Sequence, residues 1–125
     1  MSDLRLARLT VAIALICISP SLAAAESSEY VYCSNGIVCF RAPCPSGNAL
    51  DLVTGKIVKG VALNTTELPL QDRVAPDTSD KLYAGKLVVR GSIQHRGEPS
   101  EPSMLVVTRI ERASDKAERR RCAAH

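Results

Sequence analysis

The sequence predicts a small all-β domain, either an antiparallel sheet or an OB-like barrel of about five to six strands, stapled by disulfides and followed by a short polar C-terminal tail. Branched aliphatic residues alternate with polar residues in several short segments, which is the pattern of half-buried strands. Turn residues separate these segments. The chain has five cysteines, no tryptophan, one phenylalanine and three tyrosines, so aliphatic packing and covalent links are expected to stabilise it.

Residues 1–25 have the features of a secretory signal peptide. Two arginines precede the apolar run LTVAIALICI (9–18), and SPSLAAA ends in the small residues that a signal peptidase recognises. The run is shorter than the roughly 20 residues of a membrane-spanning helix. Lipoprotein processing would need a small residue directly before Cys17, where the sequence has isoleucine. We therefore expect cleavage after Ala25 or Ala23, a periplasmic or secreted protein, and no stable membrane insertion.

Removal of the signal peptide leaves one domain, residues 26–125, with four cysteines. The formal charge falls from +3 to +2, because two positive residues and one negative residue are lost. Nucleic-acid-binding proteins usually concentrate strong basic charge on one face, so no nucleic-acid partner is expected. The oxidised mature protein is expected to be soluble and monomeric, with Cys122 in a disulfide.

Two hairpins are predicted in the first half of the domain. YVYC and IVCFR flank Asn35-Gly36, the strongest short turn signal in the chain. ALDLV and KIVKGVAL flank Thr54-Gly55, a two-residue connection in which glycine allows a positive φ. This second hairpin is expected to run from about Ala49 to Leu63.

A third hairpin follows a turn-rich connection. NTTELPLQDRVAPDTSDK (64–81) contains two prolines and is expected to cross the sheet with at most one helical turn, where it would cap an open barrel. GKLVVRGSIQ (85–94) and SMLVVTRIER (103–112) both repeat with a period near two residues. We expect these two segments to pair as an antiparallel hairpin.

The tail from about residue 111 is basic and lacks an apolar stripe. It is expected to form a solvated helix, with Ser114 as a candidate N-cap, or an extended strand end, attached to the domain only through Cys122. Six Lys or Arg side chains face three acidic ones between residues 109 and 125. Attraction to anionic lipid is a weaker alternative, because no apolar side chain accompanies the arginines and salt screens their charge.

Four cysteines remain in the domain, separated by five, four and seventy-seven residues. A four-cysteine zinc site usually has two close pairs, and a thiol-disulfide oxidoreductase has C-x-x-C at a helix N-terminus. Neither pattern occurs here. Structural disulfides are therefore expected among Cys33, Cys39, Cys44 and Cys122.

Three connectivities are open to four cysteines. We favour Cys39 with Cys44, because prolines on both sides of Cys44 restrict the backbone and favour a tight loop. Cys33 would then pair with Cys122 and tie the first strand to the tail. A Cys33–Cys39 bond stays open for a longer, bulged turn, because a two-residue turn at Asn35-Gly36 directs Cys39 to the other face.

The run CFRAPCPSGNALDLVTGK, followed by GKLVVRGSI and LVVTRI, resembles a set of small secreted bacterial proteins of unknown function. These proteins carry a C-x4-C element with a proline, then a VTG-type strand and an LVVRG-type strand. The resemblance covers about residues 33 to 110. It implies an exported bacterial domain, supports the pairing of Cys39 with Cys44, and carries over no catalytic residue.

Catalytic chemistry has little support in the sequence. His95 lies in a polar loop, where a solvated side chain is expected. Asp51 alternates with two leucines and is expected to face solvent from a strand. The sequence has no nucleophile elbow, phosphate loop or dinucleotide-binding fingerprint. We therefore predict a noncatalytic binding or structural module, with no metal and no cofactor, whose partner is a protein, a glycan or an envelope component.

The alternative function is that of a protease inhibitor. Arg41 and Ala42 would lie on a disulfide-closed loop that Pro43 and Pro45 stiffen, and preorganisation lowers the ordering cost of binding to a protease cleft. The more ordinary interpretation of Arg41 is a surface residue at the end of a strand.

Overall fold

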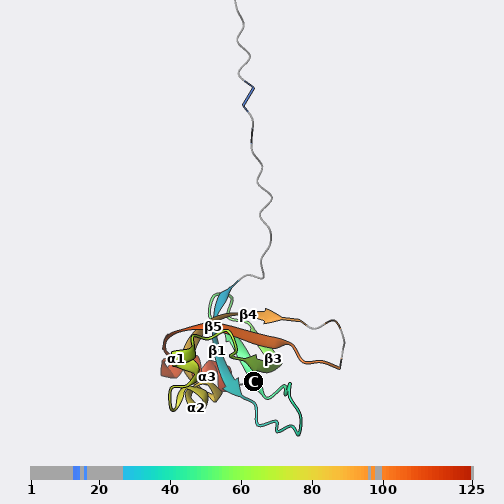
Figure 1. Cartoon of the computed structure of the whole chain (residues 1–125), viewed down its shortest axis with the longest axis vertical. Helices are drawn as coiled ribbons and strands as arrows, with labels where there is room; N and C mark the ends of the chain where they lie inside the picture. The colour runs from blue at the N-terminus through green and yellow to red at the C-terminus, as the bar shows by residue number, and fades with distance from the viewer. Residues whose placement is uncertain (1–12, 15, 17–26, 96, 98–99, 125) are drawn as a thin grey trace, which may run out of the picture.

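The computed structural model describes residues 13–14, 16, 27–95, 97 and 100–124. The predicted signal peptide therefore lies outside the described residues, apart from residues 13, 14 and 16. The described part forms five strands and three helices (Figure 1). The strands are β1 (Ser28–Ser34), β2 (Gly47–Asp51), β3 (Ile57–Asn64), β4 (Ala84–Gln94) and β5 (Met104–Ala113). The helices are α1 (Leu70–Arg73), α2 (Thr78–Tyr83) and α3 (Lys116–Ala123).

The strands form a closed barrel in the order β1-β2-β3-β5-β4, with β4 returning to β1. Every neighbouring pair is antiparallel except β3 and β5, which run parallel from the Ala62–Met104 pair to the Asn64–Val106 pair. Parallel pairing needs a crossover connection, and the segment with α1 and α2 begins that crossover after β3. The small, disulfide-stapled all-β fold is confirmed, and it takes the form of a closed five-stranded barrel with one parallel strand pair.

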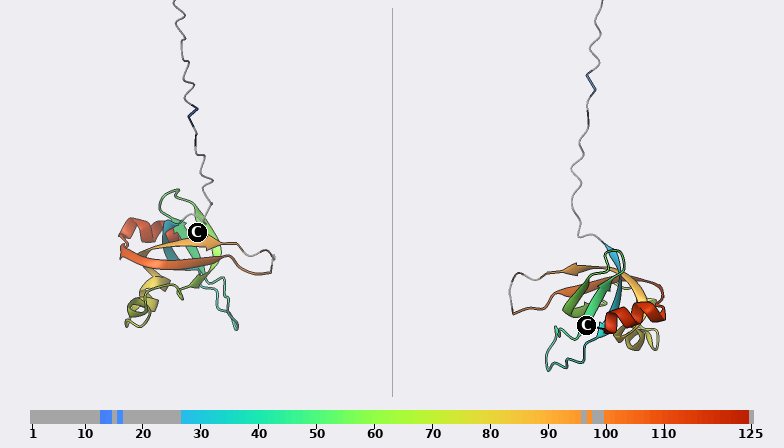
Figure 2. Two further views of the ribbon diagram at one scale, coloured as in Figure 1. Left: turned by 45° about the horizontal axis from the view of Figure 1, so that its top comes forward. Right: turned by 180° about the vertical axis from the view of Figure 1, so that it is seen from behind.

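The hairpin of β4 and β5 is confirmed, and these are the two longest strands of the barrel (Figure 2). The hairpin of β2 and β3 also forms, but its connection is longer than the predicted two residues. The Asp51 amide donates to the Lys56 carbonyl, and the Asp51 carboxylate accepts hydrogen bonds from the amides of Val53 and Thr54. The aspartate side chain therefore closes the turn from its first residue.

The hairpin predicted at Asn35-Gly36 is wrong. The antiparallel partner of β1 is β2, and their pairing ends at Ser34 and Gly47. Residues 35–46 form the loop that connects the two strands (Figure 1). The Asn35 amide donates to the Ser46 carbonyl, and its side chain donates to the Pro45 carbonyl. Asn35 is thus bound across the base of a long loop instead of starting a tight turn. The segment IVCFR is not a strand, which leaves five strands.

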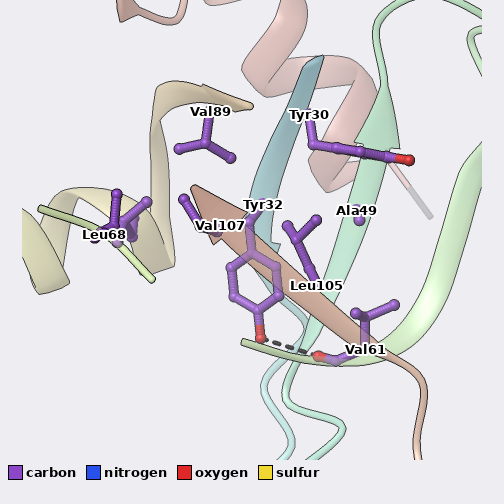
Figure 3. Close-up of a cluster of buried hydrophobic side chains, with 9 residues drawn as sticks. Tyr30, Tyr32, Ala49, Val61, Leu68, Val89, Leu105 and Val107 are labelled. Carbon is purple, nitrogen blue, oxygen red and sulfur yellow. Dashed lines mark hydrogen bonds between the residues drawn. The ribbon is translucent and has the colours of Figure 1, made fainter. Parts of the chain in front are cut away.

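The barrel interior is filled by side chains from all five strands (Figure 3). Tyr32 is 1% exposed, and its hydroxyl donates to the Val61 carbonyl at 3.0 Å. Leu68 and Leu82 close one end of this core from the segment between β3 and β4. That segment contains α1 and α2, which is more helix than the single turn predicted for residues 64–81.

Helix α3 packs on the outer face of the barrel, against β1 and β2 (Figure 2). Cys122 on α3 lies in a second buried cluster with Val31 and Leu50, which point outward from their strands. The helix begins at the N-cap Asp115, so Ser114 is not the cap. Ser114 is buried and its hydroxyl donates to the Gly85 carbonyl. The tail is therefore docked by packing as well as by a disulfide.

The structure joins Cys33 to Cys122 and Cys39 to Cys44, which is the connectivity favoured from the sequence. Structural disulfides of this kind persist in oxidising compartments. Within the described residues, no helix is long and apolar enough to cross a membrane.

Candidate functional site

Residues 35–46, here called the cystine loop, carry three exposed large hydrophobic side chains, Ile37, Val38 and Phe40. The Cys39–Cys44 disulfide closes the loop internally. Its base is fixed by the two Asn35 hydrogen bonds to Ser46 and Pro45. Val38 is 92% exposed and Phe40 109% exposed, although Phe40 is the one phenylalanine of the sequence. The loop thus presents apolar side chains to solvent on a covalently closed support.

A groove of about 490 Å³ lies beside the cystine loop, and we call it the β3–β5 groove. The loop supplies one wall, and the other walls come from the end of β3, the turn after it, the end of α2 and the start of β5. The lining residues are Ala42, Pro43, Cys44, Ser46, Ala62, Leu63, Asn64, Thr65, Thr66, Tyr83 and Met104. The volume is within the usual range of ligand sites, roughly 300–1,000 Å³.

Tyr83 connects the groove to the core of the barrel. Its ring packs edge-on against the buried Tyr32 ring, with the ring centroids 5.7 Å apart. Burial raises the pKa of the Tyr32 hydroxyl above its ordinary value of 10.0, while the Ser46 hydrogen bond opposes the rise. That hydroxyl is neutral at physiological pH and can both donate to Val61 and accept from Ser46. Tyr83, which lines the groove, therefore packs against a buried tyrosine whose neutral hydroxyl is hydrogen-bonded on both sides.

The groove presents no charged side chain among its described lining residues. Its polar groups are hydroxyls and one amide, and the Asn64 amide oxygen accepts from the backbone amide and the hydroxyl of Thr66. The remaining lining is largely apolar. Such a surface suits an uncharged segment of a ligand, because a charged group buried there would lose hydration without gaining an opposite charge.

The two residues considered for catalysis lie apart from the β3–β5 groove. Asp51 accepts a hydrogen bond from the Ser28 hydroxyl at 2.9 Å as well as closing its turn. The His95 Nδ1 atom lies 2.9 Å from the Ser103 hydroxyl at an exposed position directly after β4. Both side chains have local partners that account for their positions. Among the described residues, no group of three or more His, Cys, Asp and Glu side chains is placed to hold a metal ion.

The structure brings part of the predicted binding loop into the groove. Ala42 and Pro43 line it, whereas Arg41 is exposed outside it and Pro45 serves the base of the loop. The lining residues from β3, α2 and β5 were not predicted. They meet there because β3 pairs with β5, a contact between distant segments that no local pattern indicates.

Comparison of the chain with protein-family models, with curated protein sequences and with solved structures finds no match.

Proposed function

We propose that this protein is an exported, noncatalytic binding module that recognises a protein partner through the cystine loop and the adjoining β3–β5 groove. The observation that carries the proposal is the exposure of Phe40 inside the Cys39–Cys44 ring and of Val38 directly before it, next to an uncharged groove. Exposed apolar side chains grouped on a stiff support are typical of interaction surfaces. The closed loop lowers the entropy that binding must remove.

A protein partner is favoured over a glycan by the chemistry of the loop. Valine and isoleucine side chains offer nothing to a sugar hydroxyl, and among the described groove residues Tyr83 is the single aromatic side chain available for stacking. Aromatic anchors that enter a partner's pocket dominate many protein interfaces, and Phe40 has the exposure to do so. An uncharged, extended part of the same partner would occupy the groove.

Site-specific photocrosslinking tests this proposal. A benzophenone amino acid replaces Val38 in the loop or, as the matched control, Val53, which is 76% exposed on the β2–β3 turn. We expect a defined crosslinked protein from position 38 and none from position 53. Phe40→Ser should abolish the position 38 product while circular dichroism stays unchanged. Identical products from both positions, or no product from position 38 in the native host, would overturn the proposal.

If position 38 gives no crosslinked product and the protein binds an immobilised neutral polysaccharide, the groove would be assigned to a glycan instead. Tyr83→Ala would then be the variant that loses binding. This outcome contradicts the protein partner and retains the groove.

Protease inhibition is the second candidate, supported by the exposure of Arg41 on the closed loop. Substrate-like inhibitors present an extended segment that pairs with strands of the protease. The chain instead bends at successive residues from 40 to 43, so we rank this function second. A trypsin inhibition assay separates the two, because Arg41→Ala would remove inhibition and leave crosslinking from position 38 intact.

A further inference from the structure

Three cationic side chains line one hollow of about 360 Å³ on a part of the surface whose lining shares no residue with the β3–β5 groove. Lys81 comes from α2, Lys86 from β4 and Arg119 from α3. Leu87, Ala113 and Ser114 complete the described lining, which contains no acidic residue. We call this hollow the cationic pocket.

The strand and helix that meet here are held by specific hydrogen bonds. The Ser114 amide donates to the Lys86 carbonyl at 2.9 Å, which fixes the end of β5 beside β4. One guanidinium nitrogen of Arg119 donates to the Ser114 carbonyl at 2.6 Å. A guanidinium carries five N–H donors, so others remain for a ligand after this bond is made. Arg119 is thus oriented by the protein while retaining its capacity to bind an anion.

The two acidic residues of α3 and its cap that lie near Arg119 in the sequence, Asp115 and Glu118, have partners of their own. Glu118 forms a two-point interaction with Arg112, with N–O distances of 2.8 and 2.9 Å. Asp115 accepts from the Glu118 amide as the cap of α3. No ion pair joins Lys81, Lys86 or Arg119 to a carboxylate within the described ranges. Like charges that share a pocket repel one another, and an anion bound between them adds attractions that offset this repulsion.

We infer that the cationic pocket binds a phosphate group. A guanidinium offers a planar pair of donors that suits phosphate oxygens, and two ammonium groups add charge without a fixed geometry. The tetrahedral dianion would sit between α2, β4 and α3 and make charge-assisted hydrogen bonds to all three. The phosphate belongs either to a soluble molecule or to a lipid headgroup, and the same three side chains would recognise both.

Titration with inorganic phosphate tests the inference. Amide chemical shifts of the oxidised protein are recorded at constant ionic strength, with sodium chloride as the reference salt. We expect saturable shifts at Lys86, Leu87, Ser114 and Arg119 that chloride does not reproduce. K81Q/K86Q should weaken binding by about a hundredfold, because each of the two lost charge-assisted hydrogen bonds is worth about tenfold.

The matched control is K56Q/K59Q, which removes the same charge from two exposed lysines that are not in the pocket lining. It should bind phosphate as the parent protein does. A second arm measures sedimentation with phosphatidylglycerol vesicles against phosphatidylcholine vesicles. Phosphate-induced shifts without sedimentation assign a soluble phosphate, and lysine-dependent sedimentation assigns a lipid headgroup. Equal behaviour of K81Q/K86Q and K56Q/K59Q in both arms would overturn the inference.

Discussion

The Cys33–Cys122 disulfide is expected to supply a large share of the folding free energy. It links residues 89 positions apart, whereas the Cys39–Cys44 disulfide links residues 5 positions apart. In the chain-entropy model, the longer link stabilises the domain by about 4 to 5 kcal/mol and the shorter one by about 2 kcal/mol. Small domains are stable by only about 5–15 kcal/mol, so opening the longer link should bring this one close to unfolding.

Urea denaturation followed by circular dichroism measures this difference. In the C39A/C44A variant, a reducing agent opens only the Cys33–Cys122 disulfide and leaves both of its sulfur atoms in the core. The comparison of oxidised and reduced C39A/C44A therefore isolates the covalent link from the packing of the two side chains. The reasoning is refuted if this reduction lowers the free energy of unfolding by less than the loss of the shorter disulfide does.

Three further predictions concern single residues. Gly47→Ala should destabilise the domain by about 2 kcal/mol or more, because the added Cβ would lie 2.1 Å from the Tyr32 ring. Gly97→Ala, whose added Cβ meets no atom within 4 Å, is the control, and equal melting temperatures for the two variants would contradict the clash. Tyr32→Phe leaves a buried carbonyl of β3 without its donor and should cost about 1–3 kcal/mol in urea denaturation, so an unchanged midpoint would show that the bond adds nothing. The Arg112 hydrogen bond lowers the pKa of Glu118 from 4.5 to about 2 in the folded state, so its stabilisation is present above pH 4.5 and is lost as the pH falls toward 2. Glu118→Gln should therefore reduce the acid dependence of stability in that window, and a parallel acid profile would argue against this pair.

Local sequence patterns predicted the strands well where both partners are close in the chain. The alternation in residues 85–94 and 103–112 corresponds to β4 and β5, because a hairpin buries one face of each strand and needs no information from elsewhere. Residues 30–33 read YVYC without a polar member because both faces of β1 are covered, one by the core and the other by α3. The strand at this run was predicted correctly. Its predicted partner IVCFR was wrong, because β1 pairs with β2 and β4.

The error at Asn35-Gly36 shows what a turn signal leaves out. Gly36 does adopt a positive φ of 82°, as the dipeptide suggests. The chain nevertheless fails to reverse there, because Asn35 bonds to residues 45 and 46 and the disulfide holds the intervening segment as a loop. A dipeptide predicts a backbone conformation, whereas strand pairing depends on which segments bury apolar surface together. The β3–β5 groove escaped prediction for the same reason, since it forms where two distant strands pair in parallel.

The Cys33–Cys122 disulfide explains how so small a domain holds two chemically different surfaces in place. Cys33 lies next to Ser34, the last residue of β1, and the cystine loop begins directly after it. Cys122 lies on α3, which also carries Arg119 into the cationic pocket. One covalent bond therefore fixes the start of the loop and the helix that lines the pocket against the same strand. With a single exposed phenylalanine and three tyrosines, the chain has little aromatic area for its core, and the 89-residue span of that bond makes up part of the difference.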